Sequence, residues 1–132
     1  DCPNAAAAAL PGLTQVLGSM ILAHPRQLTT AESSVLRQAL QVAATRYFAP
    51  DMLNSIDSLL VAEECDCGCA TVWFIPGTAS AGQVVAEAET QHGEQFIGVT
   101  VFAKNSMLSG LEVTGSGERT PLPSPNAKWT AI

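Results

Sequence analysis

The chain has 132 residues, of which 47% are apolar, 14% charged and 5% aromatic, and 12 acidic against 6 basic side chains give a formal net charge of −6. This length and apolar content fit one compact domain, 1–132, and exclude an intrinsically disordered chain. No stretch approaches the roughly 20 uninterrupted apolar residues of a membrane-spanning helix, so we expect no membrane segment. A net negative chain also matches nucleic acid poorly, because binding there depends on Lys and Arg beside phosphates.

The first 27 residues are predicted to form an N-terminal helical extension. Between residues 13 and 21, apolar side chains recur at the i, i+3, i+4, i+7, i+8 spacing of one buried helix face. His24-Pro25 ends this helix, because the residue before a proline avoids the α conformation. No basic start precedes the apolar residues, so the segment lacks the pattern of a signal peptide, and we expect a cytoplasmic protein.

Residues 28–57 predict two further helices. Thr29 and Glu32 have the spacing of a capping box, in which each side chain satisfies a backbone N–H at the helix start. Apolar residues then follow one stripe of a helix from about residue 30 to residue 47. Pro50 suits the first position of a short third helix.

From residue 58 the hydrophobic period changes from 3.6 to 2, which indicates strands. The linkers are short and rich in Gly, Ser, Asn or Pro, so strands that are neighbours in sequence should pair antiparallel. In the fourth strand Ile97, Val99 and Val101 share one face and Phe96 and Phe102 the other, which predicts a central strand covered on both sides. The predicted strands are 58–64, 71–75, 83–90, 95–103 and 107–114.

These patterns predict an α+β fold, with N-terminal helices packed on one face of a five-stranded antiparallel meander. The single domain would consist of the extension 1–27, the helices of 28–57, the sheet of 58–114 and an extended tail, 115–132. The tail contains Pro-Leu-Pro-Ser-Pro, whose prolines cannot donate to a strand ladder, so we expect it to be surface chain. Trp129 in this tail is a candidate for docking onto the fold or contacting a partner.

Charge is distributed unevenly along the chain. Between Tyr47 and Ala103 there is no Lys or Arg, although many carboxylates fall there. If the first and third predicted strands lie near each other, these carboxylates form a negative patch that steers a basic protein partner. The alternative is a solvated sheet face that keeps the protein soluble. The candidate partner-binding residues are Glu63, Glu64, Asp66, Glu87, Glu89 and Glu94.

Three cysteines, Cys65, Cys67 and Cys69, fall within five residues at a predicted turn between two strands. Thiolates ligate soft metals, but a structural zinc site normally has two separated C-x-x-C pairs, which this chain lacks. A disulfide from Cys2 to one of the three would need an oxidising compartment. The third alternative is reduced, buried cysteines that fill small spaces at a tight turn, and on this interpretation we expect neither metal nor cofactor.

The sequence carries no recognisable catalytic motif. His24 and His92 lie at the ends of predicted elements, without the nucleophile and orienting acid that a general base needs. G-x-S-x-G, H-E-x-x-H, P-loop and G-x-G-x-x-G patterns are all missing. We therefore expect no catalytic residues and a protein that is not an enzyme; a hydrolase assembled from scattered residues such as His92 and Glu94 is the weakest alternative.

Three motifs occur in a fixed order: C-D-C-G-C at 65–69, the hairpin V-F-A-K-N-S-M-L-S-G-L-E-V at 101–113, and P-L-P-S-P at 121–125. Over about residues 28–126 they resemble a group of small, uncharacterised bacterial proteins with a C-G-C turn and an L-P-x-P tail. Ala70 stands where that pattern has proline, and residues 1–27 have no counterpart in it. Members of the group are similar in size and charge to immunity proteins that neutralise bacterial toxins, including those of contact-dependent growth inhibition systems.

The resemblance and the acidic stretch together imply a non-enzymatic binding protein, an immunity protein that covers the active site of a cationic toxin. A nuclease toxin must be basic to hold nucleic acid, so carboxylates in place of phosphates would bind it fast and tightly. The alternative function is a metal-binding or redox module centred on Cys65, Cys67 and Cys69.

Overall fold

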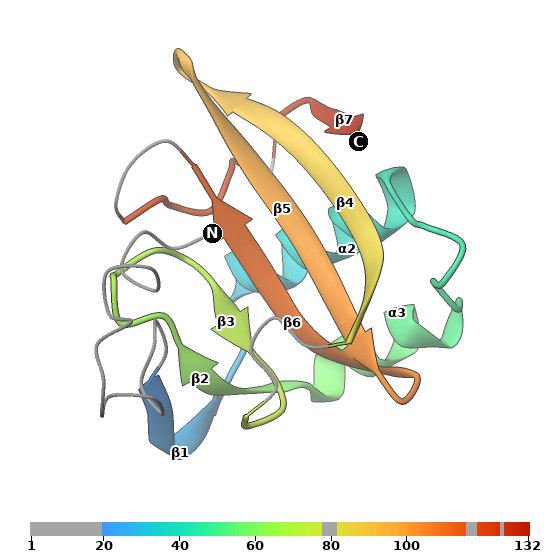
Figure 1. Cartoon of the computed structure of the whole chain (residues 1–132), viewed down its shortest axis with the longest axis vertical. Coiled ribbons are helices and arrows are strands. Elements are labelled where there is room, and N and C mark those ends of the chain that lie inside the picture. Colours follow the sequence, from blue (N-terminus) through green and yellow to red (C-terminus); the bar gives the residue numbers. More distant parts are fainter. Residues whose placement is uncertain (1–19, 78–81, 116–118, 125) are drawn as a thin grey trace, which may run out of the picture.

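The computed structural model describes residues 20–77, 82–115, 119–124 and 126–132 of the chain. In these ranges seven strands form one antiparallel sheet, in the order β1-β2-β3-β6-β5-β4-β7 (Figure 1). The strands are β1 (Met20–Gln27), β2 (Leu60–Glu64), β3 (Val72–Trp73), β4 (Gln83–His92), β5 (Gln95–Lys104), β6 (Met107–Thr114) and β7 (Trp129–Ala131).

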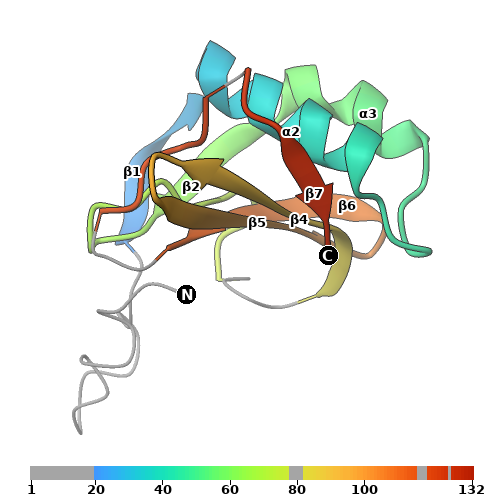
Figure 2. The ribbon, with the colours of Figure 1, turned by 90° about the horizontal axis from the view of Figure 1, so that it is seen from above.

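Two helices, α2 (Thr30–Val42) and α3 (Asp51–Ser55), lie on one side of the sheet (Figure 2), and a 3-10 turn, η2 (Ile56–Ser58), follows α3. Among the described residues, no helix has the length and apolar character needed to cross a membrane. The main core lies between α2 and the sheet. Its buried helix residues are Val35, Leu36, Ala39 and Leu40, which share one face of α2.

The predicted start of α2 is confirmed, whereas its predicted end is not. The Thr29 hydroxyl accepts the Glu32 N–H at 3.0 Å, and the Glu32 carboxylate accepts the Thr29 N–H at 2.8 Å, which completes the capping box. The helix ends at Val42 rather than near residue 47, because the chain then turns to meet β4. There the Thr45 N–H donates to the Val85 carbonyl at 2.8 Å.

The prediction of a five-stranded meander with N-terminal helices packed on one face is wrong. The described chain enters the sheet as β1 before any helix, and seven strands rather than five form a sheet that is larger than the helical layer. Residues 13–19 of the predicted first helix lie outside the described residues. Residues 20–27 form an edge strand on β2, in which Met20 pairs with Glu64 and Gln27 with Leu60.

Pro25 is compatible with a strand at this position, although the sequence pattern predicts the end of a helix there. A proline cannot donate to a strand ladder and is tolerated on an edge strand or at an irregularity. Pro25 sits on such an edge, in the irregular part of β1 between the pairings of Ile21 and Arg26. The apolar spacing of the preceding residues therefore did not determine the conformation of residues 20–27.

The five predicted strands exist, but β3 pairs with β6 instead of with β4. Trp73 lies opposite Gly110, where a Cβ would collide with the indole ring. Next to this pair, Val72 faces Leu111, and both are buried in the core under α2. The strand order thus depends on a contact between residues that are far apart in sequence, which the alternation within each strand cannot reveal.

The C-terminal tail also joins the sheet, contrary to the expectation of extended surface chain. Strand β7 pairs with β4, with Trp129 opposite Thr90. The Trp129 indole N–H donates to Gln38 Oε1 of α2 at 2.9 Å, and the ring packs against the core. Trp129 therefore docks the tail onto the fold.

Strand β5 is covered on both sides over only part of its length. Ile97, Val99 and Val101 are buried under the helical layer, as the alternation predicts. On the other face Phe102 is buried against Trp73, with ring centroids 5.7 Å apart, whereas Phe96 is 58% exposed. The second face of the sheet is therefore covered around Trp73 and open towards the β4–β5 turn.

We predict that Gly110→Ala destabilises the protein by about 1–3 kcal/mol, because the added methyl group overpacks the contact with Trp73. Urea unfolding of both proteins measures the difference as a lower midpoint at an unchanged slope. In the Trp73→Leu background the same substitution should cost less, since the two sites are in contact. Equal midpoints for the parent protein and Gly110→Ala would contradict this packing.

Candidate functional site

Three buried cysteines occupy the loop between β2 and β3. Burial alternates along it: Cys65, Cys67 and Cys69 point inward, while the intervening residues Asp66 and Gly68 are exposed. Gly68 has a φ of +92°, a conformation that costs glycine little. The loop thereby directs three thiol-bearing side chains to one place.

The sulfur atoms are in mutual contact range. All three Sγ atoms lie within 4.8 Å of one another, and those of Cys65 and Cys67 are 2.8 Å apart. The Cys69 N–H points at the Cys67 sulfur at 3.4 Å. The sequence predicted the turn, but not that the three sulfurs converge.

Thr71 anchors the cluster to the sheet. Its hydroxyl donates to the Val113 carbonyl of β6 at 3.1 Å and accepts the Val113 N–H at 2.9 Å. The Cys69 thiol in turn donates to this hydroxyl at 3.4 Å. Sequence reasoning missed Thr71 because its partner lies 42 positions away, and nothing in the local pattern marks the contact.

The three cysteines differ in oxidation state. Cys65 and Cys69 are reduced, and Cys67 is disulfide-bonded. Cys2, which the sequence offers as a disulfide partner in one of the alternatives, lies outside the described residues. The alternative of three reduced cysteines at the turn therefore does not describe Cys67.

Burial is the largest cause that raises the pKa of the Cys65 thiol, to about 12. A backbone hydrogen bond from Cys67 acts against this shift, while Cys69 and the Asp66 carboxylate add to it. Removing water disfavours the thiolate, and nearby negative charge does the same. Cys65 is therefore a neutral thiol near pH 7.

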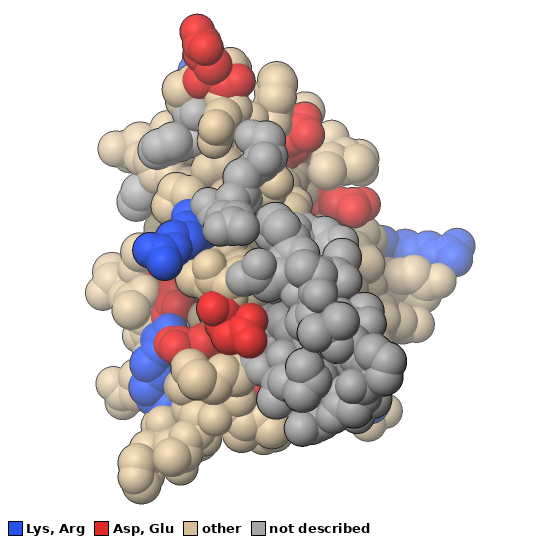
Figure 3. Space-filling view, turned by 60° about the vertical axis from the view of Figure 1, so that its left-hand side comes forward, with Lys and Arg blue, Asp and Glu red and all other residues tan. Residues whose placement is uncertain are grey.

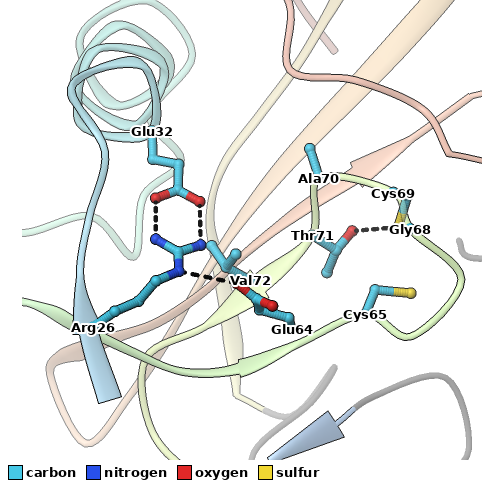
Figure 4. Close-up of a pocket in the computed structure, with 9 residues that line it drawn as sticks. All are labelled: Arg26, Glu32, Glu64, Cys65, Gly68, Cys69, Ala70, Thr71 and Val72. Carbon is cyan, nitrogen blue, oxygen red and sulfur yellow. Dashed lines mark hydrogen bonds and ion pairs between the residues drawn. The ribbon is translucent and has the colours of Figure 1, made fainter. Parts of the chain in front are cut away.

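A pocket of about 220 Å³ opens beside the cluster (Figure 4). Cys65 and Cys69 line one end, and an ion-pair network lines the other. In this network Arg26 of β1 donates two hydrogen bonds to the Glu32 carboxylate, at 2.9 and 3.0 Å, and one to Glu64 Oε2 at 2.9 Å. Arg26 thus joins two carboxylates at one end of the pocket, and Cys65 and Cys69 are among the residues at the other end.

The network changes the ionisation of its members. Burial acts to raise the pKa of Glu32, but hydrogen bonds from Arg26 and the Thr29 N–H outweigh it, and the pKa of Glu32 is lowered. The hydrogen bond to Glu32 is the main cause that raises the pKa of Arg26, although burial acts against it. Arg26 and Glu32 therefore both stay charged at neutral pH.

The structure does not bring the six predicted partner-binding carboxylates together on one exposed surface. Glu63 is 2% exposed and accepts the Gly77 N–H inside the fold. Its neighbour Glu64 points to the opposite face and pairs with Arg26. Figure 3 shows acidic side chains in separate groups, one of them beside basic side chains.

The other four carboxylates lie at three separate places. Asp66 is exposed on the cysteine loop. Glu87 and Glu89 lie on β4, on the face away from α2, where Glu87 is half-buried. Glu94 is exposed at the β4–β5 turn. No continuous acidic patch forms from the six residues.

No protein family model matches this chain, and no curated protein or solved structure is recognisably similar to it. The resemblance to small bacterial proteins with a C-G-C turn therefore stays a prediction, as does the link to immunity proteins.

We predict that alkylation of Cys65 by iodoacetamide keeps accelerating with pH. The thiolate is the reactive form, so the rate should rise about tenfold per pH unit between about pH 7 and 10, without the plateau of an ordinary thiol near pH 8.5. In the unfolded chain the Cys65 thiol ionises at a lower pH than in the folded protein. The free energy of unfolding should therefore fall as the pH rises above about 8.5. Mass spectrometry of a variant with Ser at the other three cysteines measures the rate; a plateau below about pH 9 would contradict the raised pKa.

We predict that Arg26→Ala costs about 1–3 kcal/mol of stability near pH 7, because it leaves the buried Glu32 carboxylate without its cation. The lowered pKa of Glu32 stabilises the fold above the unfolded-state pKa of about 4.3, and this contribution is lost as the pH falls below that value. The difference in the free energy of unfolding between the parent protein and Arg26→Ala should therefore become smaller below about pH 4.

Arg37→Ala is the matched control for this experiment. Arg37 pairs with Asp57 at 2.7 Å, but the Asp57 side chain is 85% exposed, so the loss should be at most about 1 kcal/mol. Chemical unfolding at pH 7 measures both variants. If Arg26→Ala and Arg37→Ala lower the free energy of unfolding equally, the ion pairs of Arg26 stabilise the fold no more than an exposed ion pair does.

Proposed function

We propose that this protein binds one soft metal ion through the thiolates of Cys65, Cys67 and Cys69. The observation that carries the proposal is the convergence of three buried sulfurs within 4.8 Å, from a loop held by the sheet. Metal–sulfur bonds of about 2.3 Å place the sulfurs of one site roughly 3.8–4.0 Å apart. To reach that geometry, the sulfur atoms of Cys65 and Cys67 must move apart from their present separation of 2.8 Å. This is a small rearrangement.

The donor set defines the class of ion. Thiolate sulfur favours soft or borderline ions such as Cu(I) and Zn(II) over Mg²⁺ or Ca²⁺, which take oxygen ligands. Three sulfurs complete a trigonal Cu(I) site, whereas tetrahedral Zn(II) needs a fourth ligand. Cys65 and Cys69 both line the pocket, which leaves room for a ligand from solution on that side.

Binding in this form depends on the redox state of the protein. A disulfide sulfur is not a thiolate, so Cys67 must first be reduced by two electrons from a dithiol or phosphine, while Cys65 and Cys69 already are thiols. All three must then lose their protons as the ion binds. The proposal therefore predicts metal binding by the reduced protein only.

The test is an anaerobic titration of the reduced protein with Cu(I) and, separately, Zn(II), against a competing chelator. We expect one ion per chain, and a loss of about tenfold or more in affinity for Cys69→Ser. Glu94→Gln is the control, because this exposed carboxylate lies at the β4–β5 turn, outside the cysteine loop. The metal affinity of this variant should stay within about threefold of that of the parent protein. Absence of binding to the reduced protein, or equal binding by a variant with Ser at 65, 67 and 69, would refute the proposal.

The immunity-protein function remains a prediction with less support from the geometry. Two of its six carboxylates are engaged within the fold, Glu63 by Gly77 and Glu64 by Arg26. Electrostatic capture of a cationic toxin would have to depend on the separate sites at Asp66, Glu87, Glu89 and Glu94. The expectation that the protein is not an enzyme likewise stays a prediction.

A further inference from the structure

Arg119 of the C-terminal tail lies against the cysteine loop. A Cβ atom added to Gly68 would lie 2.9 Å from Arg119 Cγ and 3.4 Å from its Nε, so the arginine side chain crosses the loop at the one residue that has no side chain. Gly68 stands between Cys67 and Cys69 in the chain. The spacing of neighbouring residues therefore places the guanidinium group within roughly 10 Å of the sulfur cluster.

The backbone of the tail holds Arg119 in this place. The carbonyl of the next residue, Thr120, accepts the Ala70 N–H at 2.9 Å, and Thr120 is buried. Arg119 itself has a φ of +57°, a left-handed conformation that few residues other than glycine adopt. Such a conformation persists only where the surrounding contacts impose it, and it is frequent at functional sites. The fold thus directs this arginine to the cysteine loop.

The other charged groups around the loop sum to a negative charge. Arg26 is paired with Glu32 and Glu64, and Asp66 on the loop adds another carboxylate. Among the residues that the structure describes, no carboxylate forms an ion pair with Arg119. Arg119 is therefore the cation placed to offset further negative charge in the loop.

Metal binding creates such a charge. Three neutral thiols that bind one ion release three protons to the buffer, so the complex carries three negative charges less the charge of the ion. A Cu(I) complex has a charge of −2, and a Zn(II) complex with water as its fourth ligand has a charge of −1.

We propose that Arg119 compensates this charge and shifts the selectivity of the site towards the monovalent ion, an inference that rests on the metal-binding function proposed above. The Coulomb energy is proportional to the product of the two charges. Arg119 therefore stabilises the Cu(I) complex twice as much as the Zn(II) complex. A residue that only packs against the loop would affect both complexes alike.

The test is an anaerobic titration of the reduced parent protein and of reduced Arg119→Gln with each ion, near pH 7 and at low salt. For each ion the affinity of the variant is divided by that of the parent, so the affinity of the competing chelator cancels. We expect the variant to bind Zn(II) about threefold and Cu(I) about tenfold more weakly, because the doubled charge squares the factor. Both losses should shrink in about 0.5 M salt.

Two further variants separate charge from packing. Arg119→Lys keeps the charge and should bind both ions within about twofold of the parent. Arg46→Gln removes the same charge from the connection between α2 and α3, which lies across β6, β5 and β4 from the loop between β2 and β3 (Figure 1). It should change neither affinity by more than about twofold. Arg119 and Arg46 are both exposed, so none of these substitutions disturbs the core.

Three results would overturn this inference: unchanged affinities in Arg119→Gln, equal losses for the two ions, or equal losses in Arg119→Lys and Arg119→Gln. In each of these cases the parent protein still binds metal, so the proposed function stands. If the reduced parent protein binds neither ion, both proposals are refuted.

Discussion

The candidate site depends on the pairing of the two-residue strand β3 with β6. Trp73 fits across Gly110, Val72 enters the core opposite Leu111, and Thr71 bonds both backbone groups of Val113. These contacts fix the position of β3, and β2 pairs with β3 in the antiparallel direction. The loop that joins β2 to β3 must therefore reverse the direction of the chain. Because side chains alternate along this loop, the three cysteines at odd positions converge while the residues between them face outward.

The ion pairs of Arg26 form the second set of contacts around the pocket beside the cysteine loop. Arg26 of the edge strand β1 joins the first turn of α2, through Glu32, to the end of β2, through Glu64. Glu32 also caps its own helix, so one carboxylate both starts α2 and holds β1 against it. The ion pairs that join β1, α2 and β2 therefore also form one wall of the pocket beside the cysteine loop.

Features that depend on neighbouring residues were predictable from the sequence, and features that depend on distant contacts were not. The capping box of Thr29 and Glu32 and the five internal strands follow from local spacing, and the structure contains them. The edge strand β1, the β3–β6 pairing and the docking of Trp129 depend on partners elsewhere in the chain. The sequence indicated the cysteines of the site but not Arg26 or Thr71. Glu63 and Glu64 are adjacent in a strand, so the alternation of side chains alone places them on opposite faces of the sheet.

The central claim is that the cysteine cluster, once Cys67 is reduced, binds a soft metal ion through three thiolates. X-ray absorption spectroscopy of the reduced, metal-loaded protein tests it most directly, because it reports the atoms bound to the metal. The account predicts a first shell dominated by about three sulfur atoms near 2.3 Å, with sulfur lost from the shell in Cys69→Ser. A shell of nitrogen and oxygen alone, unchanged by that substitution, would contradict it.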